Sequence, residues 1–330
     1  METTYCPFCM SETHGQDRCP RCGNAASAYV TLTHHLAPDT LLHGRYLMGG
    51  VLGEGGSGIT YIARDGASGD RVAIKEYFPK DTAARIAATS IEVVPCAGIS
   101  RESFARRRAR FLHQAHQIAS VKDDGVIVEL IDAFEDNGTA YAVMEYVEGS
   151  TLLELAQTSD GRIPLARLLE VTEPVFGALG ALHAAGLIHR DVSPDNIMLA
   201  DGRIRLIDLG SARESLNGTR MLTVMLKDGY APIEQYSHRG QGPWTDVYGL
   251  SATLYRCLTG TLPPSALDRQ IRDELVRPRS LGVQMSRSQE AALMRGLSVR
   301  PTRRFRSVAA FHDALFCTDR LTALMRRALT

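Results

Sequence analysis

The chain has 330 residues, of which 44% are hydrophobic, and its 37 basic and 37 acidic side chains give a formal net charge of zero. That length exceeds what one hydrophobic core usually serves, so we expect two lobes or domains. A neutral balance excludes a general electrostatic attraction to nucleic acid or to a membrane surface. No apolar run approaches the ~20 residues of a membrane-spanning helix, and the N-terminus lacks the basic region and apolar core of a signal peptide. We therefore expect a cytoplasmic protein with reduced cysteines.

The N-terminal residues 1–24 contain two Cys-x-x-Cys pairs: Cys6 with Cys9, and Cys19 with Cys22. Four thiolates in this spacing can bind one tetrahedral Zn²⁺, and a segment this short cannot hold itself together with a core. It resembles a minimal zinc ribbon with a structural metal, and it offers a surface for a partner. Two disulfides are the alternative, which a reducing compartment disfavours. Met10 stands where the second pair has Gly23, so we expect a less tight first turn.

Residues 25–42 are small, polar and weakly patterned, and we interpret them as a linker. Apolar strands are then expected at Tyr46–Leu52 and at Ile59–Ala63. The turn between them carries the glycines of a Gly-x-Gly-x-x-Gly pattern: Gly53, Gly55 and Gly58. Glycines let backbone N–H groups approach phosphate oxygens closely. A dinucleotide-binding fingerprint would need a helix after this turn, and the β-branched residues there favour a strand.

The next apolar strand, Val72–Lys75, delivers a single lysine. By itself Lys75 would be interpreted as an edge-strand side chain facing water, but its place about twenty residues after the glycine turn favours a functional role. An amphipathic helix is expected at Glu102–Val121. Strands are expected at Val126–Phe134 and Thr139–Met144, joined by an Asn-Gly turn.

The run Ile188–Ile197 places a carboxylate and a carboxamide five positions apart, at Asp191 and Asn196. A second carboxylate, Asp208, ends the apolar run Ile204–Ile207 and precedes Leu-Gly. Asp191 can orient or deprotonate a hydroxyl, while Asn196 and Asp208 can hold Mg²⁺ through oxygen ligands. This combination is suited to phosphoryl transfer.

The remainder of the chain is predicted to be mainly helical. Apolar residues recur at helical spacing in Leu165–His183 and Asp246–Leu258, and a further helix is expected at Ser307–Phe316. Leu321–Leu329 has the pattern of an amphipathic helix.

Over about residues 43–316 these elements resemble the protein-kinase superfamily, and within it the bacterial eukaryotic-like (Hanks-type) Ser/Thr protein kinases. The resemblance includes the Ile-Lys-Glu-Tyr-Phe-Pro run at Ile74–Pro79 and the Gly-Tyr-Ala-Pro run at Gly229–Pro232. It implies an α+β, two-lobed kinase-like fold, with a small β-rich N-lobe and a larger α-helical C-lobe. The implied domains are a zinc ribbon (1–24), a linker (25–42), a kinase domain (43–316) and a C-terminal helical tail (317–330).

The resemblance also implies the site residues and the function. The residues that would bind ATP are Lys75, the three turn glycines, and the hinge backbone at Glu145 and Val147. Asn196 and Asp208 would hold Mg²⁺, and Asp191 would orient a Ser or Thr hydroxyl for in-line attack on the γ-phosphate. The implied function is ATP- and Mg²⁺-dependent phosphorylation of proteins, autophosphorylation included.

Three positions depart from the kinase pattern. Where the helix usually carries the glutamate partner of the strand lysine it has Gln114, so we expect a weaker Lys75–Gln114 pair. Ser193 stands where Ser/Thr kinases have a lysine that reaches the γ-phosphate, and Lys227 stands where they have a threonine. Our hypothesis is that the two residue types are exchanged. Lys227 would then supply the missing positive charge and Ser193 the hydroxyl.

The expected activation segment lies between Asp208 and Glu234 and ends in Ala-Pro-Ile-Glu, an Ala-Pro-Glu element with one extra residue. By the resemblance, Glu234 pairs with Arg304, and Asp246 supports the backbone of the catalytic loop. The candidate phosphate acceptors in the segment are Ser211, Ser215, Thr219 and Thr223.

Two other functions compete with a protein kinase. A pseudokinase scaffold would bind nucleotide or protein partners without efficient catalysis. Gln114 and Ser193 favour it. The presence of Lys75, Asp191, Asn196 and Asp208 opposes it. A small-molecule phosphotransferase would have a short activation segment, unlike the long one here.

Overall fold

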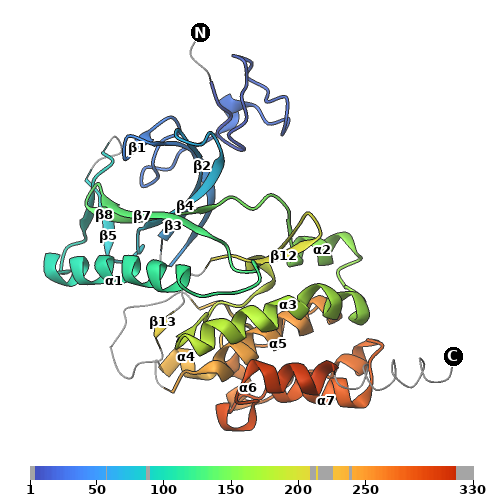
Figure 1. The fold of residues 1–330 in the computed structure, drawn as a ribbon. Coiled ribbons are helices and arrows are strands. Elements are labelled where there is room, and N and C mark those ends of the chain that lie inside the picture. The colour runs from blue at the N-terminus through green and yellow to red at the C-terminus, as the bar shows by residue number, and fades with distance from the viewer. Residues whose placement is uncertain are drawn as a thin grey trace. The chain divides into compact units, whose positions relative to one another are not determined.

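The computed structural model describes residues 4–56, 58–86, 90–208, 213–214, 226–237 and 240–316. It divides into two compact units, which are described separately. The first holds residues 1–120 and 129–147, and the second holds residues 121–128 and most of the chain from residue 148 onward. One unit is rich in β-strands and the other is mainly helical (Figure 1), which confirms the predicted fold class. Within the described ranges, no helix is both long enough and apolar enough to cross a bilayer.

The first unit is built on a six-stranded antiparallel sheet in the order β1-β2-β3-β4-β8-β7 (Figure 1). The strands are β1 (Leu41–Leu42), β2 (Tyr46–Gly55), β3 (Gly58–Asp65), β4 (Arg71–Tyr77), β7 (Leu130–Asp136) and β8 (Thr139–Glu145). A separate pair is formed by β5 (Ala83–Arg85) and β6 (Val93–Pro95). The strand expected at Val126–Phe134 begins later, because the backbone of Val126 and Val128 bonds to Leu206 in the second unit instead.

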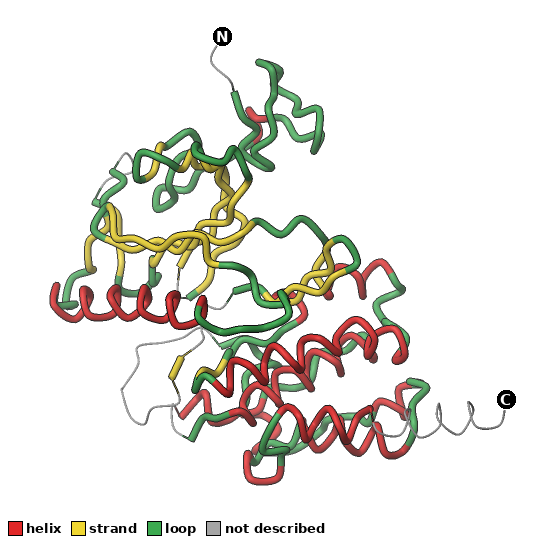
Figure 2. The backbone as a smooth tube through the Cα atoms, viewed as in Figure 1, coloured by secondary structure: helices red, strands yellow, loops and turns green. Residues whose placement is uncertain are grey.

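The helix α1 (Arg101–Ala119) covers one face of this sheet (Figure 2). It begins at Ser100, whose hydroxyl accepts a hydrogen bond from the N–H of Ser103, a standard N-cap. Phe104 and Phe111 are buried at helical spacing and contact the ring of Tyr77 at centroid distances of 5.5 and 5.6 Å. Side chains alternate along a strand, so Lys75 shares this face of β4 with Tyr77.

The opposite face of β4 carries Glu76, which is fully buried. Its carboxylate accepts hydrogen bonds from Arg85 at 2.7 Å, from Tyr61 at 3.0 Å and from Tyr141 at 3.1 Å. A buried carboxylate is tolerated when its charge is paired and its oxygens are bonded. Glu76 is therefore unavailable as a partner for Lys75.

The segment 25–42 packs on the sheet. It contains the short helix η1 (Ala26–Ala28), and Leu36 is buried within the sheet's core cluster. The N–H of Leu36 donates to the hydroxyl of Tyr61 at 3.1 Å. The segment interpreted as a linker thus has contacts that fix its path.

The second unit is mainly helical (Figure 2). Its helices are α2 (Leu152–Thr158), α3 (Leu165–Ala184), α4 (Ile233–Ser237), α5 (Pro243–Thr259), α6 (Ala266–Ile271) and α7 (Arg287–Gly296), with short turns η2 (Pro194–Asn196), η4 (Pro278–Leu281) and η5 (Pro301–Arg303). Residues 308–316 are also helical. Its strands are β9 (Ser150–Thr151), β10 (Leu187–Ile188), β11 (Ile197–Ala200), β12 (Arg203–Leu206) and β13 (Arg213–Glu214).

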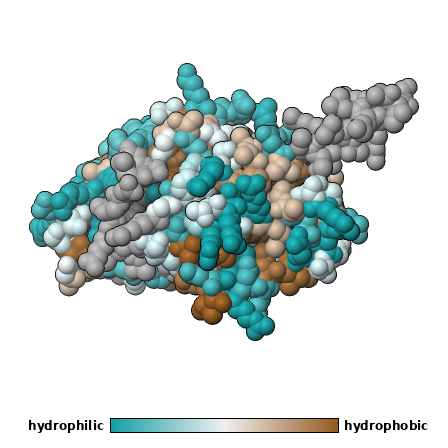
Figure 3. Space-filling model, turned by 90° about the horizontal axis from the view of Figure 1, so that it is seen from below, coloured by the Kyte–Doolittle hydropathy of each residue, from teal (hydrophilic) through white to brown (hydrophobic). Residues whose placement is uncertain are grey.

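The core of this unit surrounds α5, which is buried along almost its whole length and packs on α3 and α7. The predicted helices in this region are confirmed, apart from Leu321–Leu329, which lies outside the described residues. Leu267 and Ile271 are among the apolar side chains that remain exposed. On the face drawn in Figure 3, hydrophobic residues lie among hydrophilic ones.

Candidate active site and cysteine cluster

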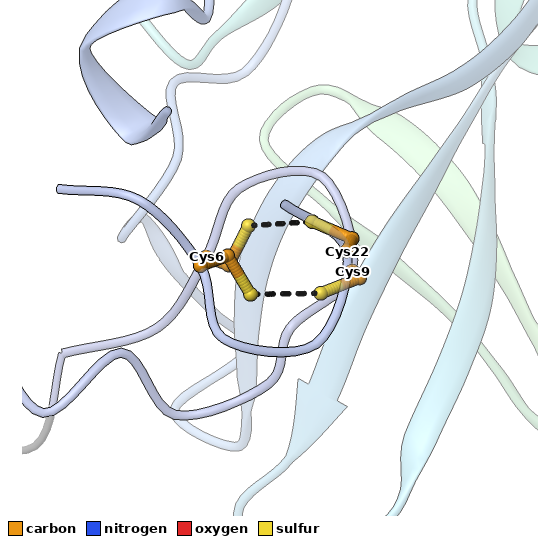
Figure 4. A group of neighbouring side chains, drawn as sticks. Cys6, Cys9 and Cys22 are labelled. Carbon is orange, nitrogen blue, oxygen red and sulfur yellow. Dashed lines mark hydrogen bonds between the residues drawn. The ribbon is translucent and has the colours of Figure 1, made fainter. Parts of the chain in front are cut away.

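The four N-terminal cysteines converge, with all sulfur atoms within 4.8 Å of one another (Figure 4). The Sγ atoms of Cys6 and Cys22 are 3.6 Å apart, as are those of Cys9 and Cys19. A disulfide bond would place paired sulfurs at about 2.05 Å, so the alternative of two disulfides is not formed. Four thiolates around an ion with Zn–S bonds of about 2.3 Å stand nearly 3.8 Å apart. The cluster therefore fits a small zinc ribbon.

One ligand is ready to ionise near neutral pH. Burial opposes ionisation of Cys19, yet the N–H groups of Cys22 and Arg21 lower the pKa of its thiol to about 7. A thiolate is the form that binds metal. Burial raises the pKa of Cys6 to about 12 and raises that of Cys22 as well, so these two thiols do not share the preference of Cys19 for the thiolate form.

The turns of the two cysteine pairs are equivalent. Met10 has φ +51° and its N–H donates to Cys6 at 2.8 Å, while Gly23 has φ +73° and donates to Cys19 at 2.9 Å. The prediction of a less tight first turn is wrong. Met10 adopts the left-handed conformation that glycine usually occupies.

The side chain of Met10 is buried against β2, a contact that glycine at this position could not make. A Cβ atom at Gly49 would lie 2.5 Å from the Met10 sulfur, and one at Gly50 would lie 2.7 Å from the Pro7 carbonyl oxygen. The N–H of Gly50 donates to that oxygen at 2.6 Å. The cysteine cluster therefore docks on the strand that leads into the glycine turn.

The glycine turn is a β-hairpin, with Gly55 opposite Gly58 in the β2–β3 register. The predicted strand after the turn is confirmed, which excludes a dinucleotide-binding fingerprint. A Cβ at Gly58 would lie 2.0 Å from the carbonyl oxygen of Glu76, so packing requires glycine there. Gly53 and Gly55 have no atom within 4 Å of a built Cβ. Their backbone is open to a ligand.

Lys75 lies in the middle of the sheet, between β3 and β8, and is only 5% exposed. The alternative of an edge-strand side chain facing water is therefore excluded. Gln114 is half-buried on α1. The pairing of Lys75 with Gln114 stays a prediction. Glu145 ends β8, where its N–H donates to the carbonyl of Glu129 at 3.1 Å, and Val147 follows.

In the second unit, the loop after β10 is fixed by Asp246 at the start of α5. One Asp246 oxygen accepts from the N–H of His189 at 2.9 Å and the other from the N–H of Arg190 at 2.7 Å. Burial opposes ionisation of Asp246, but its bond from His183 at 2.7 Å helps to hold its pKa below the usual range. Arg190 has a φ of +69°, so this carboxylate stabilises an unfavourable backbone conformation.

The same loop connects the carboxylate and the carboxamide singled out by the sequence. The side-chain nitrogen of Asn196 donates to the backbone carbonyl of Asp191 at 2.8 Å. The N–H of Ile207 donates to the carbonyl of Asn196 at 2.9 Å, which holds the end of β12 there, beside Asp208. Because the first bond uses the amide nitrogen, the amide oxygen of Asn196 stays available as a ligand. The backbone thus links the segment that carries Asn196 to the end of β12, where Asp208 follows.

Lys227 lies against this loop. Its ammonium nitrogen is 2.9 Å from the hydroxyl of the fully buried Ser193, 3.4 Å from a carboxylate oxygen of Asp195 and 3.9 Å from one of Asp191. The two residues that appear exchanged in the sequence are therefore in direct contact.

Glu234 and Arg304 form the predicted ion pair, with hydrogen bonds of 2.6 and 3.1 Å. Both side chains are almost completely buried. The hydroxyl of Thr245, at the start of α5, also donates to Glu234 at 3.0 Å. The end of the activation segment is thereby tied to α5.

Sequence reasoning missed two residues that support the loop. His183 was interpreted only as the end of a helix, and Gln235, whose side chain donates to the carbonyl of Arg190 at 2.8 Å, was not singled out. Neither lies in a pattern that would identify its partner. The candidate phosphate acceptors of the activation segment lie outside the described residues.

Comparison with known proteins gives a match to the family described as "Protein kinase domain" over residues 46–316. The DNA damage-responsive serine/threonine-protein kinase RqkA of Deinococcus radiodurans is 30% identical over 308 residues, covering 89% of this chain and 41% of that protein. Serine/threonine-protein kinase PknB of Mycobacterium leprae is 29% identical, covering 81% of this chain and 42% of its own length. The chain thus spans about two fifths of the curated relatives it matches.

Solved structures agree on the fold. The apo form of PpkA-294 is 28% identical and covers 86% of this chain and 99% of its own, with a TM-score of 0.69. The kinase domain of Mycobacterium tuberculosis PknI is 25% identical and covers 86% and 98%, with a TM-score of 0.61. With the family match extending over both units described above, the chain belongs to the protein kinase family.

Proposed function

We propose that this protein transfers the γ-phosphoryl group of ATP to Ser or Thr hydroxyls of proteins, in a Mg²⁺-dependent reaction. The observation that carries the proposal is the loop around Asp191. Its backbone is fixed by Asp246, its carboxamide partner Asn196 is bonded to it, and the cation of Lys227 lies 3.9 Å from its carboxylate. A phosphoryl-transfer site needs this kind of positioned charge more than strong proton abstraction.

Asp191 is the residue for the acceptor hydroxyl. Its side chain is 23% exposed, so a substrate hydroxyl can reach it, and its backbone is held on both sides. The carboxylate would orient that hydroxyl and accept its proton late in the transfer. The ammonium group of Lys227, beside it, would stabilise negative charge on the transferred group.

Asn196 and Asp208 supply the oxygen atoms that fit Mg²⁺. When bound, the ion would neutralise charge on the phosphate oxygens. On the first unit, the open backbone at Gly53 and Gly55 and the buried Lys75 would bind the phosphates. The relatives named above carry the same function in their names, which supports the proposal.

A nucleotide-binding scaffold is the second candidate. Gln114 favours it, because a neutral carboxamide at this position would be a weaker partner for Lys75 than a glutamate. The scaffold would still bind ATP but would transfer its phosphoryl group poorly.

Purified protein incubated with labelled ATP and Mg²⁺ distinguishes the two functions. We expect phosphate on the protein itself or on an added protein such as casein, and its loss in Asp191→Asn. Asp201→Asn, an exposed turn residue, is the matched control and should retain transfer. Equal transfer by Asp191→Asn and wild type, or none by wild type that still binds ATP, would contradict the proposal.

We also propose that the four cysteines hold a structural Zn²⁺. The convergence of their sulfur atoms and the short segment that carries them support this. Zinc content per chain should fall by about one ion in the double variant Cys9→Ser/Cys19→Ser. Cys96→Ser, which changes an isolated cysteine, should leave it unchanged.

A further inference from the structure

A second cluster of metal-binding side chains lies outside the cysteine cluster and the catalytic loop. His34 and His35 both direct Nε2 at the same carboxylate oxygen of Glu54, at 3.1 and 3.2 Å. All three ligand atoms lie within 4.8 Å of one another. Glu54 stands between Gly53 and Gly55 in the glycine turn, while the histidines come from the segment 25–42.

Both imidazole rings are held in place by their surroundings. The carbonyl of His34 accepts a hydrogen bond from Arg85 at 2.9 Å, and the residue after His35, Leu36, is bonded to Tyr61. The His34 ring stacks on Phe78 with centroids 6.0 Å apart. Adjacent residues in an extended chain normally direct their side chains apart. His34 and His35 instead direct both rings at one oxygen of Glu54, which is the arrangement that a shared ligand would require.

We propose that His34, His35 and Glu54 form a binding site for a divalent cation of the zinc class, with three protein ligands and one open position. Two imidazole nitrogens and one carboxylate oxygen are a ligand set that Zn²⁺ accepts at about 2.0–2.2 Å. Ligands of a tetrahedral ion at those lengths stand about 3.3 Å apart. The observed 3.1 and 3.2 Å need only small adjustments.

One side of this site is open to solvent, because its three side chains differ in exposure. The side chain of His35 is 7% exposed, whereas those of His34 and Glu54 are 33% and 27% exposed. Water can therefore occupy the fourth position and an ion can enter from that side. A fully enclosed site would have needed a fourth protein ligand.

The surroundings also set the affinity. Without metal, each Nε2–H donates to Glu54; with metal, the imidazole proton moves to Nδ1. The Nδ1 atom of His35 is buried and has no hydrogen-bond partner, so a proton there lacks an acceptor. A missing second-shell acceptor weakens metal binding. This site should thus bind zinc more weakly than the cysteine cluster.

A bound ion would tie the tip of the β2–β3 hairpin to the segment 25–42. Resting on the proposed function, the consequence is that zinc would restrict the glycine turn and lower the affinity for ATP. The metal site itself does not depend on that function, because it is measured without nucleotide.

The test counts zinc by equilibrium dialysis of the full chain in excess free zinc. We expect about two ions per chain for wild type and about one for His34→Gln/His35→Gln, the cysteine cluster keeping its own. His113→Gln, an exposed histidine on α1, is the matched control and should keep both. The variant Glu54→Gln changes a residue of the hairpin turn and should also bind one ion fewer. Its circular dichroism spectrum should match that of wild type, which would show that the fold is unchanged.

One ion per chain in wild type that the double-histidine variant keeps would overturn the site. Two ions in either the double-histidine or the Glu54 variant would overturn it as well. If the double-histidine variant fails to fold, the Glu54 variant alone decides. ATP affinity measured with and without zinc then tests the consequence separately. An unchanged affinity beside two bound ions would reject the coupling and leave the metal site standing.

Discussion

Replacing Lys227 with methionine should slow phosphoryl transfer while leaving the fold intact. The change removes the ammonium group and keeps most of the apolar stem. The lost group lies 2.9 Å from the Ser193 hydroxyl and 3.9 Å from an Asp191 carboxylate oxygen. It is therefore close to the hydroxyl and to the phosphoryl group that Asp191 would align.

To estimate the size of the effect, we place the transferred phosphoryl group about as far from the ammonium group as Asp191 is. Two unit charges 3.9 Å apart interact by about 4 kcal/mol at an effective dielectric constant of about 20. Lys227 is 38% exposed, so water screens part of this interaction. We take about 2.7 kcal/mol as the loss of transition-state stabilisation, which is a decrease in kcat of about 10²-fold.

Steady-state kinetics with labelled ATP would measure it. The KM for ATP should change little, because the charge acts mainly in the transition state. Lys227→Arg keeps a cation and should retain most of the rate, and Lys80→Met, which removes an exposed lysine, should retain all of it. The variant Ser193→Lys/Lys227→Thr restores the arrangement usual in Ser/Thr kinases and should recover part of the loss. Full activity in Lys227→Met would refute the exchange of roles.

Three further predictions concern stability and nucleotide binding. Glu234→Gln should lower the free energy of unfolding by roughly 3–5 kcal/mol in urea denaturation, because it leaves the guanidinium of Arg304 buried without its counter-charge; a loss below 1 kcal/mol would show that the pair does not brace the unit. The hydrogen bonds from Arg45 hold the pKa of Asp65 at about 2, so its contribution to stability is complete above its unfolded pKa of 3.8 and is lost as the pH falls towards 2. Unfolding measured against pH should show this loss in wild type and not in Asp65→Asn. Gln114→Glu should tighten ATP binding, measured by calorimetry, because a carboxylate is a stronger partner for the lysine of β4; an unchanged affinity would reject that assignment.

The parts of the site that could be predicted from the sequence are those with a local pattern. The glycine turn was recognised as a hairpin because β-branched residues follow it, and the register of Gly55 with Gly58 agrees. The pair of Glu234 and Arg304 is distant in the chain, and only the resemblance to kinases made it visible. Geometry then added what no pattern gives, namely that Lys227 contacts Ser193.

What the sequence could not predict depends on contacts between distant segments that have no signature of their own. Met10 looked like a poor substitute for glycine, and its value appears only when Gly49 leaves room for its side chain. Residues 25–42 looked like a linker because they are small, polar and weakly patterned. The buried side chain of Leu36, its hydrogen bond to Tyr61 and the pairing of β1 with β2 nevertheless fix the path of this segment.

These missed contacts converge on one strand. The backbone of β2 is bonded at Gly50 to Pro7 of the cysteine cluster and at Val51 to the hydroxyl of Tyr29, at 2.6 and 2.8 Å. Four residues beyond Gly50, Glu54 meets the two histidines. The N-terminal segment therefore holds the hairpin at its base and near its tip. A hairpin fixed at both points has fewer conformations available to it, in the open and in the closed state. Removal of the contacts at Gly50 and Val51, or of those at Glu54, should therefore change the conformation of the glycine turn. None of these contacts lies within the catalytic loop.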